Sequence, residues 1–117
     1  MKTHKDLDIW IKGINLVTDI YNLTKNFPKE ERYGLTSQMR RAAISYPCNI
    51  SEGAARKSKT EYIHFIYIAL GSLSELETQV IIANNLGYIS CIDDLLTELE
   101  ALRKMTLNFI KYLKNKK

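Results

Sequence analysis

The chain has few residues that break helices, and it lacks the alternating pattern of a strand. Its 117 residues include five glycines and two prolines, and no run alternates β-branched with polar residues as a half-buried strand does. Apolar residues instead recur every three or four positions, which is the spacing of one helix face. With 45% hydrophobic residues, a chain of this length suits one core. We therefore expect a single all-α domain over residues 1–117, with a short basic C-terminal tail at residues 114–117.

The sequence also has few features of secreted, membrane-bound or disulfide-rich proteins. Its opening, MKTHKDLDIW, carries charges where a signal peptide has an apolar run. The uncharged, strongly apolar segment at residues 62–74 is too short to cross a bilayer. Cys48 and Cys91 lack the spacing of metal ligands, so we expect buried free thiols. These features favour a cytoplasmic protein that does not contact a membrane.

Candidate catalytic groups are scarce. Glu61 and His64 match the Glu-x-x-His spacing of metal-carboxylate bundles once, whereas such a site needs two copies. The two histidines leave few bases to activate a nucleophile. The run from Gly53 to Ser58 lacks the glycine spacing of a phosphate-binding loop. We expect no enzyme activity, no bound metal and no cofactor.

The first two helices are predicted from apolar spacing and local signals. The first spans about residues 5–26, and Thr36 is the expected N-cap of a second helix that reaches about Arg56. Pro47 should bend that second helix, because proline lacks an amide hydrogen and clashes with the carbonyl four residues back. Gly53 should let a neighbouring backbone approach closely.

Two capping boxes predict where the last two helices begin. In residues 58–61, SKTE, the serine side chain can accept a bond from a free amide at the start of a third helix. Gly87 is its expected left-handed C-terminal cap. Residues 90–93 suggest a similar box ahead of a fourth helix that ends near Lys114. Four helices with short connections predict an antiparallel up-down-up-down four-helix bundle.

Each of the last two helices has an apolar seam at bundle spacing. In the third helix this seam is Tyr62, Ile66, Ala69, Leu73, Leu76, Val80 and Ala83. In the fourth helix it is Ile92, Leu95, Leu99, Leu102, Thr106, Phe109 and Leu113. The first half of the third helix is apolar on nearly every side, so we expect it to be buried all round.

The first helix carries two apolar stripes. One stripe is Leu7, Trp10, Ile14, Val17 and Tyr21. The other, about 130° away around the helix, is Ile9, Leu16, Ile20, Leu23 and Phe27. A broad face inside one bundle would explain both stripes. Two stripes also suit a helix with more neighbours than one subunit supplies. We favour this second explanation and assign the oligomer interface to the second stripe.

Basic residues outnumber acidic ones, for a net charge of +4. One group brackets the connection between the second and third helices, and another crowds the C-terminus with Lys111, Lys114, Lys116 and Lys117. Up-down topology would bring both groups to one pole. Solvated charge without a partner is the alternative to nucleic-acid binding, but an oligomer that repeats the pole would contact many phosphates. The expected contacts to RNA or DNA are Arg40, Arg41, Arg56, Lys57, Lys59, Lys111 and Lys114.

The position of Glu52 in the sequence indicates a structural role. It lies four residues before Arg56, in the favourable orientation for a helical ion pair, and has no nearby base or metal ligand. We therefore expect a salt-bridging or inter-subunit role for Glu52, and structural roles for Pro47 and Gly53.

Several motifs resemble one known family. These are LTSQMRRAA at residues 35–43, the Tyr46-Pro47, Asn49-Ile50 and Glu52-Gly53 pairs with Arg56, and ALGSLSELETQ at residues 69–79. They resemble the four-helix bundle proteins that are encoded in intervening sequences of bacterial 23S ribosomal RNA genes and labelled S23 ribosomal proteins. The likeness extends from about Leu7 to Leu113 and includes Trp10 and the Phe27-Pro28 turn. Cys48, Ser51 and the Ala54-Ala55 pair depart from its commoner residues.

This family is similar to the accessory variability determinant of diversity-generating retroelements, a pentameric barrel of four-helix bundles that binds nucleic acid and a reverse transcriptase. The resemblance implies a homo-oligomer, with a pentamer favoured, a basic surface that faces nucleic acid, and no catalytic activity. The alternative function is a protein-interaction scaffold for an enzyme such as a reverse transcriptase. The ribosomal label reflects gene location and does not imply membership of the ribosome.

Overall fold

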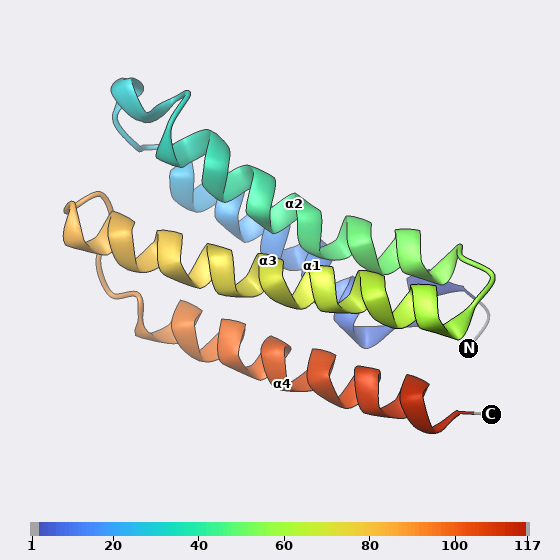
Figure 1. The fold of residues 1–117 in the computed structure, drawn as a ribbon. Coiled ribbons are helices and arrows are strands. Elements are labelled where there is room, and N and C mark those ends of the chain that lie inside the picture. Colours follow the sequence, from blue (N-terminus) through green and yellow to red (C-terminus); the bar gives the residue numbers. More distant parts are fainter. Residues whose placement is uncertain (1–2, 117) are drawn as a thin grey trace.

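Four helices run up and down the molecule in the computed structural model, which describes residues 3–116 (Figure 1). A short 3-10 turn at His4–Asp6 precedes the first helix, and another, at Lys29–Glu31, precedes the second. The helices are α1 (Asp8–Thr24), α2 (Leu35–Ala54), α3 (Lys59–Asn85) and α4 (Asp93–Asn115). Both chain ends and the α2–α3 connection lie at one end of the molecule (Figure 1). The predicted antiparallel four-helix bundle is confirmed.

The seams predicted for α3 and α4 form much of the core. All of the α3 seam is buried except the half-buried Tyr62, and four of the seven α4 seam residues are buried: Leu99, Leu102, Thr106 and Leu113. The contact between α2 and α3 is the most extensive in the bundle. A Cβ at Gly53 would lie 2.9 Å from the Cβ of Phe65, so the predicted close approach at this glycine is confirmed.

Two predicted helix ends have the expected geometry. The Ser58 hydroxyl accepts a hydrogen bond from the Glu61 amide at 3.1 Å and so caps α3. At the other end of α3, Gly87 has a φ of 80°. There the Tyr88 amide donates to the Ala83 carbonyl at 3.0 Å. This bond satisfies a carbonyl that the last turn of the helix would otherwise leave without a partner.

The predicted starts of α2 and α4 are wrong. Thr36 lies inside α2 and is buried, and the Glu31 carboxylate instead accepts a hydrogen bond from the Leu35 amide at 3.0 Å. Ile92, which has no capping side chain, precedes α4, so Ser90 is not part of a capping box. Before α2, the Tyr88 hydroxyl also donates to the Glu31 carboxylate at 2.8 Å and joins the turn to the α3–α4 loop. Before α4, Cys91 has a φ of 55°.

The stripe of α1 that was assigned to an oligomer interface lies in the core of the single subunit. Leu16 and Ile20 are fully buried, Ile9 and Phe27 are buried, and Leu23 is half-buried. The interface assignment is therefore corrected, because the four buried side chains have little surface left for a partner. The exposed apolar side chains of α1 are Ile11, Ile14 and Tyr21.

The structure differs from two further expectations, and a third stays a prediction. Cys48 and Cys91 are free, as expected, but both are exposed. The first half of α3 is not buried all round, because Tyr67 and Ile68 are exposed within the subunit. α2 continues as a helix through the buried Pro47, and the bend expected there remains a prediction.

α3 also has the length and apolar composition that would allow a helix to cross a membrane. The expectation from residues 62–74 considered only the uncharged run, whereas α3 as a whole is longer. Its buried seam packs against α2 and α4, and the core helix of a bundle satisfies the same criteria of length and composition.

Candidate nucleic-acid interface

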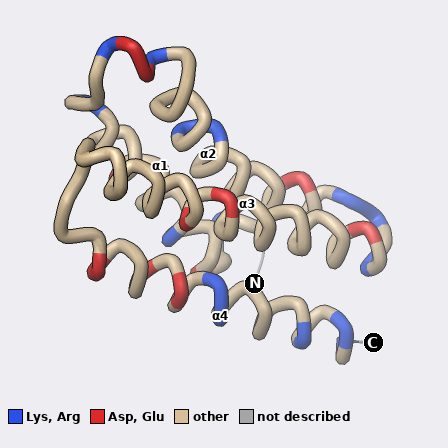
Figure 2. The backbone as a smooth tube through the Cα atoms, turned by 60° about the vertical axis from the view of Figure 1, so that its left-hand side comes forward, with Lys and Arg blue, Asp and Glu red and all other residues tan. Residues whose placement is uncertain are grey.

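The α2–α3 connection and the end of α4 lie at the same end of the molecule (Figure 2). The Lys59 ammonium donates a hydrogen bond to the Lys116 backbone carbonyl at 2.8 Å. We call the residues gathered there the basic pole: Arg56, Lys57, Lys59 and Lys116. The predicted grouping is confirmed for Lys116, whereas Lys111 and Lys114 border a separate hollow along α4. Lys117, which the sequence also places there, lies outside the described residues.

Local structure explains how the basic pole is assembled. α2 ends at Ala54, and the Ser58 cap starts α3 almost at once. The short connection therefore holds Arg56 and Lys57 at the turn. α4 has 23 residues, which corresponds to about 34 Å of helix. Because it runs antiparallel to α3, its C-terminal lysines return to the end where α3 begins.

Arg56 is the pole residue whose charge is compensated within the subunit. Its guanidinium lies 2.8 Å from a Glu52 carboxylate oxygen and 3.8 Å from one of Glu61. The same group sits over the Phe65 ring, 4.8 Å from its centroid. The predicted ion pair with Glu52 is confirmed. Arg56 is thereby fixed in place, and its charge is less available to a phosphate than that of the neighbouring lysines.

The lysines of the basic pole lack such compensation. Within residues 3–116, the ion pairs involve only Arg56 with Glu52 and Glu61, and Arg103 with Glu100. The bond from Lys59 to a neutral carbonyl orients its ammonium without cancelling the charge. Lys57, Lys59 and Lys116 are all exposed. These three lysines therefore present positive charge directly to solvent.

A second basic surface runs along α4. Lys104, Lys111 and Lys114 border a shallow hollow of about 390 Å³ together with Tyr67 of α3. The Lys114 ammonium donates to the Tyr67 hydroxyl at 3.1 Å, and the tyrosine side chain is 45% exposed. We call these four residues the α4 flank. It combines three cations with one accessible aromatic ring.

Sequence reasoning missed Lys104 and Tyr67. Lys104 lies seven residues before Lys111 and therefore on the same face of α4, so helical spacing could have shown it. Tyr67 lies on a different helix and meets Lys114 only through the packing of α3 on α4. No spacing within one helix gives that contact.

Arg40 and Arg41 are not part of the basic pole. They lie about 20 Å along α2 from its end at Ala54, near the opposite end of the bundle. The Arg40 Nε donates to the Thr24 hydroxyl at 2.9 Å, and its guanidinium lies 4.4 Å from the centroid of the Tyr21 ring. The structure therefore separates the seven residues predicted to bind nucleic acid into three regions: the basic pole, the α4 flank, and the part of α2 that carries Arg40 and Arg41.

The Glu61 and His64 pair has no additional ligands nearby. Among the described residues, no group of three or more histidine, cysteine, aspartate or glutamate side chains is arranged to hold a metal. The Glu61 carboxylate accepts a bond from the Ser58 hydroxyl at 3.2 Å and faces Arg56. Its position is explained by the start of α3.

These features define an antiparallel four-helix bundle with a lysine-rich end and a basic flank. The chain belongs to the 23S rRNA-intervening sequence protein family, whose model matches residues 5–108. The family resemblance drawn from the sequence motifs is confirmed. The relationship to the accessory variability determinant remains a prediction.

A solved structure supports the same fold. The chain is similar to a protein with unknown function from the S23 ribosomal protein family of Bacteroides thetaiotaomicron VPI-5482, with a TM-score of 0.80. The two are 23% identical, and the match covers 88% of this chain and 95% of the other. At this identity the likeness shows the fold alone. Comparison with curated proteins gives no match.

Proposed function

We propose that the chain is a non-enzymatic, homo-oligomeric protein that binds the phosphate backbone of RNA or DNA through the basic pole and the α4 flank. The observation that carries this proposal is the contact of Lys59 with the last turn of α4. That contact brings lysines from two distant segments together without pairing them with carboxylates of the described residues.

The chemistry of these lysines fits phosphate better than base edges. An ammonium is a compact, strongly hydrated charge on a flexible stem, and it neutralises phosphates without reading sequence. Each phosphate contact releases condensed counterions, so affinity should fall steeply as salt rises. The exposed Tyr67 and Tyr112 rings beside Lys114 and Lys116 could stack on unpaired bases. We therefore expect binding that tolerates many sequences.

Oligomerisation would multiply these contacts. The exposed Ile11 and Ile14 form a short apolar strip on α1, and their positions, three residues apart, share one helix face. An assembly that covers this strip would repeat the basic pole once per subunit. The family resemblance favours a pentamer. Native mass spectrometry at low micromolar concentration measures the subunit number, and a strictly monomeric protein would contradict this part of the proposal.

The binding experiment compares two double charge reversals. K57E/K59E alters the basic pole, and K25E/K29E makes the same change in net charge at the opposite end. Fluorescence anisotropy with structured RNA and DNA should show at least about a tenfold loss of affinity for K57E/K59E, with a salt slope reduced by about two. The control should lose much less. Absence of binding by the unaltered protein at low salt, or equal losses in both variants, would refute the proposal.

A protein-interaction scaffold is the second candidate. The observation that favours it is the exposed apolar group of Ile81, Ile82 and Leu86 toward the end of α3. Such a surface could bind an enzyme such as a reverse transcriptase. Affinity purification from the native host, with and without nuclease, distinguishes the two functions. Partners that survive nuclease favour the scaffold, and partners lost with the nucleic acid favour direct nucleic-acid binding.

A further inference from the structure

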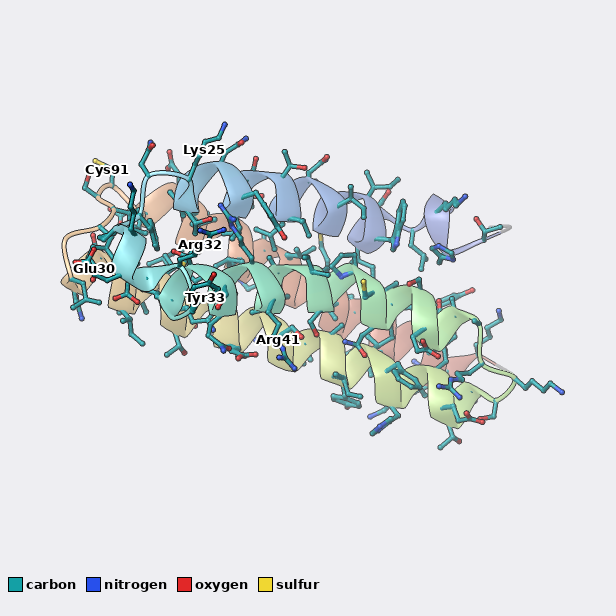
Figure 3. The ribbon with its side chains drawn as sticks, turned by 90° about the horizontal axis from the view of Figure 1, so that it is seen from above. Lys25, Glu30, Arg32, Tyr33, Arg41 and Cys91 are labelled. Carbon is teal, nitrogen blue, oxygen red and sulfur yellow. The ribbon has the colours of Figure 1, made fainter. Side chains whose placement is uncertain are left out.

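A separate hollow lies where the chain enters α2, away from the basic pole. It has a volume of about 610 Å³, and Arg32, Arg40 and Arg41 line it together with Tyr21, Tyr33 and Ile44. Arg32, Tyr33 and Arg41 can be followed on the face shown in Figure 3. We call this feature the arginine hollow. It includes Arg40 and Arg41, two of the residues that the sequence predicts to contact nucleic acid.

The charge of the arginine hollow is uncompensated. None of the described residues that line it is acidic, and none of its three arginines forms an ion pair with a described carboxylate. The nearby Glu31 carboxylate is engaged elsewhere, by the Leu35 amide at 3.0 Å and the Tyr88 hydroxyl at 2.8 Å. Three guanidinium groups around one hollow repel one another, and a bound anion would relieve that repulsion.

One of these arginines is already held in position. The Thr24 hydroxyl accepts a bond from Arg40, whose guanidinium also stacks over Tyr21. Arg40 therefore forms a fixed wall of the hollow. Arg32 and Arg41 are exposed and free of such bonds within residues 3–116. A guanidinium offers paired N–H donors that match two oxygens of a phosphate, which a lysine cannot do.

Accessible rings accompany these charges. Tyr33 is 86% exposed, and the Arg32 guanidinium lies 5.6 Å from the centroid of its ring. Tyr21 and Ile44, which are 39% and 38% exposed, supply the apolar part of the lining. An exposed tyrosine next to unpaired arginines suits a ligand with both a planar ring and a phosphate, because the ring can stack while the arginines hold the anion.

We propose that the arginine hollow binds a nucleoside monophosphate, either free or as the phosphorylated end of a nucleic-acid strand. Arg32 and Arg41 hold the phosphate, Tyr33 stacks on the base, and Arg40 with Tyr21 shapes the wall. This site is independent of the basic pole. It would add recognition of one nucleotide to a protein whose pole contacts only the backbone.

Calorimetry with AMP, inorganic phosphate and adenosine tests the site in the full-length protein. AMP should bind saturably, inorganic phosphate about tenfold more weakly, and adenosine most weakly, because only AMP has both recognised groups. R32Q/R41Q should abolish AMP binding, whereas K25Q/K29Q, which removes the same charge outside the hollow, should preserve it. Y33A should lower AMP affinity to that of phosphate, and Y33F should retain it. Thermal melting confirms that each variant is folded.

Other outcomes would overturn the proposal. Equal affinity for AMP and inorganic phosphate would make the hollow a general anion site, and loss of AMP binding in K25Q/K29Q would show a non-specific effect of charge. An oligomer whose AMP affinity rises only after dissociation would show that another copy of the chain occupies the hollow.

Two further measurements separate the ligand sources and the two sites. An oligonucleotide with a 5′-phosphate that binds about tenfold more tightly than the same strand with a 5′-hydroxyl would assign the site to strand ends. Equal binding of the two strands, with AMP still bound, would assign it to free nucleotides. K57E/K59E should leave AMP affinity unchanged. AMP binding without polynucleotide binding would therefore refute the proposed function and leave this site intact.

Discussion

The hydroxyl groups of Tyr46 and Thr106 are 2.7 Å apart in the centre of the bundle, and both side chains are fully buried. The Thr106 hydroxyl donates to the Leu102 carbonyl at 2.7 Å, so Tyr46 is the donor in the bond between them. This bond joins α2 to α4, which lie diagonally across the core. Burial raises the pKa of Tyr46 well above its ordinary value, so the tyrosine stays protonated in the folded protein.

The coupling between these two residues can be measured by a double-mutant cycle. Y46F removes the donor and T106V removes the acceptor, and each should lower the free energy of unfolding by about 1–3 kcal/mol. The double variant should lose less than the sum, since neither partner is then left unpaired. Urea unfolding of the four proteins measures this coupling. Additive losses would show that the bond contributes nothing beyond the packing of each side chain.

Gly13 fixes how closely α1 approaches α2. A Cβ at this position would lie 2.8 Å from a ring carbon of Tyr46 and 3.4 Å from the Cβ of Pro47. The Tyr46 ring cannot move away freely, because its hydroxyl is bound to Thr106. We expect G13A to lower the free energy of unfolding by about 1–3 kcal/mol.

Gly71 provides the matched control for that substitution. It lies in an exposed position of α3, and a Cβ there meets no other atom within 4 Å. G71A should therefore raise the free energy of unfolding by up to about 1 kcal/mol through helix propensity. If G13A is neutral or stabilising in the same urea experiment, α1 does not depend on this close approach.

The same residues show why the sequence predicts the fold better than the packing. Helical spacing and the cap at Ser58 are local, so the helices and their order are visible in the sequence. Gly13, in contrast, is ordinary in the sequence and becomes informative only when Tyr46 faces it. Periodicity revealed two apolar stripes on α1 but not which one faces the core, since both have helical spacing. For that reason the buried stripe was assigned to an interface.

The candidate site was predictable to a similar extent. The grouping of Lys57 and Lys59 with the C-terminal lysines follows from up-down topology alone. The neutralisation of Arg56 by Glu52 follows from spacing, but its second partner, Glu61, comes from α3 across the turn. The length of α2 separates Arg40 and Arg41 from the basic pole, so this separation also follows from the sequence. The arginine hollow could not be predicted in this way, because its lining also includes Arg32 and Tyr33. The turn that carries these two residues is held by the hydrogen bond from Tyr88 to Glu31, and Tyr88 comes from a distant segment.

Glu31 connects that turn to α2 and to the α3–α4 loop, and its charge should make stability depend on pH. Bonds from the Leu35 amide and then from the Tyr88 hydroxyl lower the pKa of the Glu31 carboxyl below its ordinary value of 4.5. Because this pKa is lower in the folded state than in the unfolded state, the charged carboxylate stabilises the protein at pH values above 4.5. The contribution is lost as the pH falls through the pKa of the folded state.

E31Q should therefore have a lower melting temperature than the unaltered protein near neutral pH, and the difference should shrink as the pH falls well below 4.5. Thermal unfolding across that range measures the difference. E30Q changes the neighbouring exposed carboxylate and should show little effect. A difference between E31Q and the unaltered protein that is constant with pH would mean that Glu31 acts through shape and not through its charge.

Removing the acid that neutralises Arg56 should strengthen nucleic-acid binding. E52Q takes away a negative charge at the basic pole and frees a guanidinium that now lies 2.8 Å from the Glu52 carboxylate. We expect affinity for RNA or DNA at low salt to rise by about two- to tenfold, with a steeper salt dependence. D94N removes an exposed acid from the first turn of α4 and makes the same change in net charge about 33 Å from Lys116 along that helix, outside both the basic pole and the α4 flank. Anisotropy titrations of both variants separate local from global charge. An equal gain in both would show that net charge alone sets the affinity, whereas a gain only in E52Q would place the nucleic acid against the basic pole.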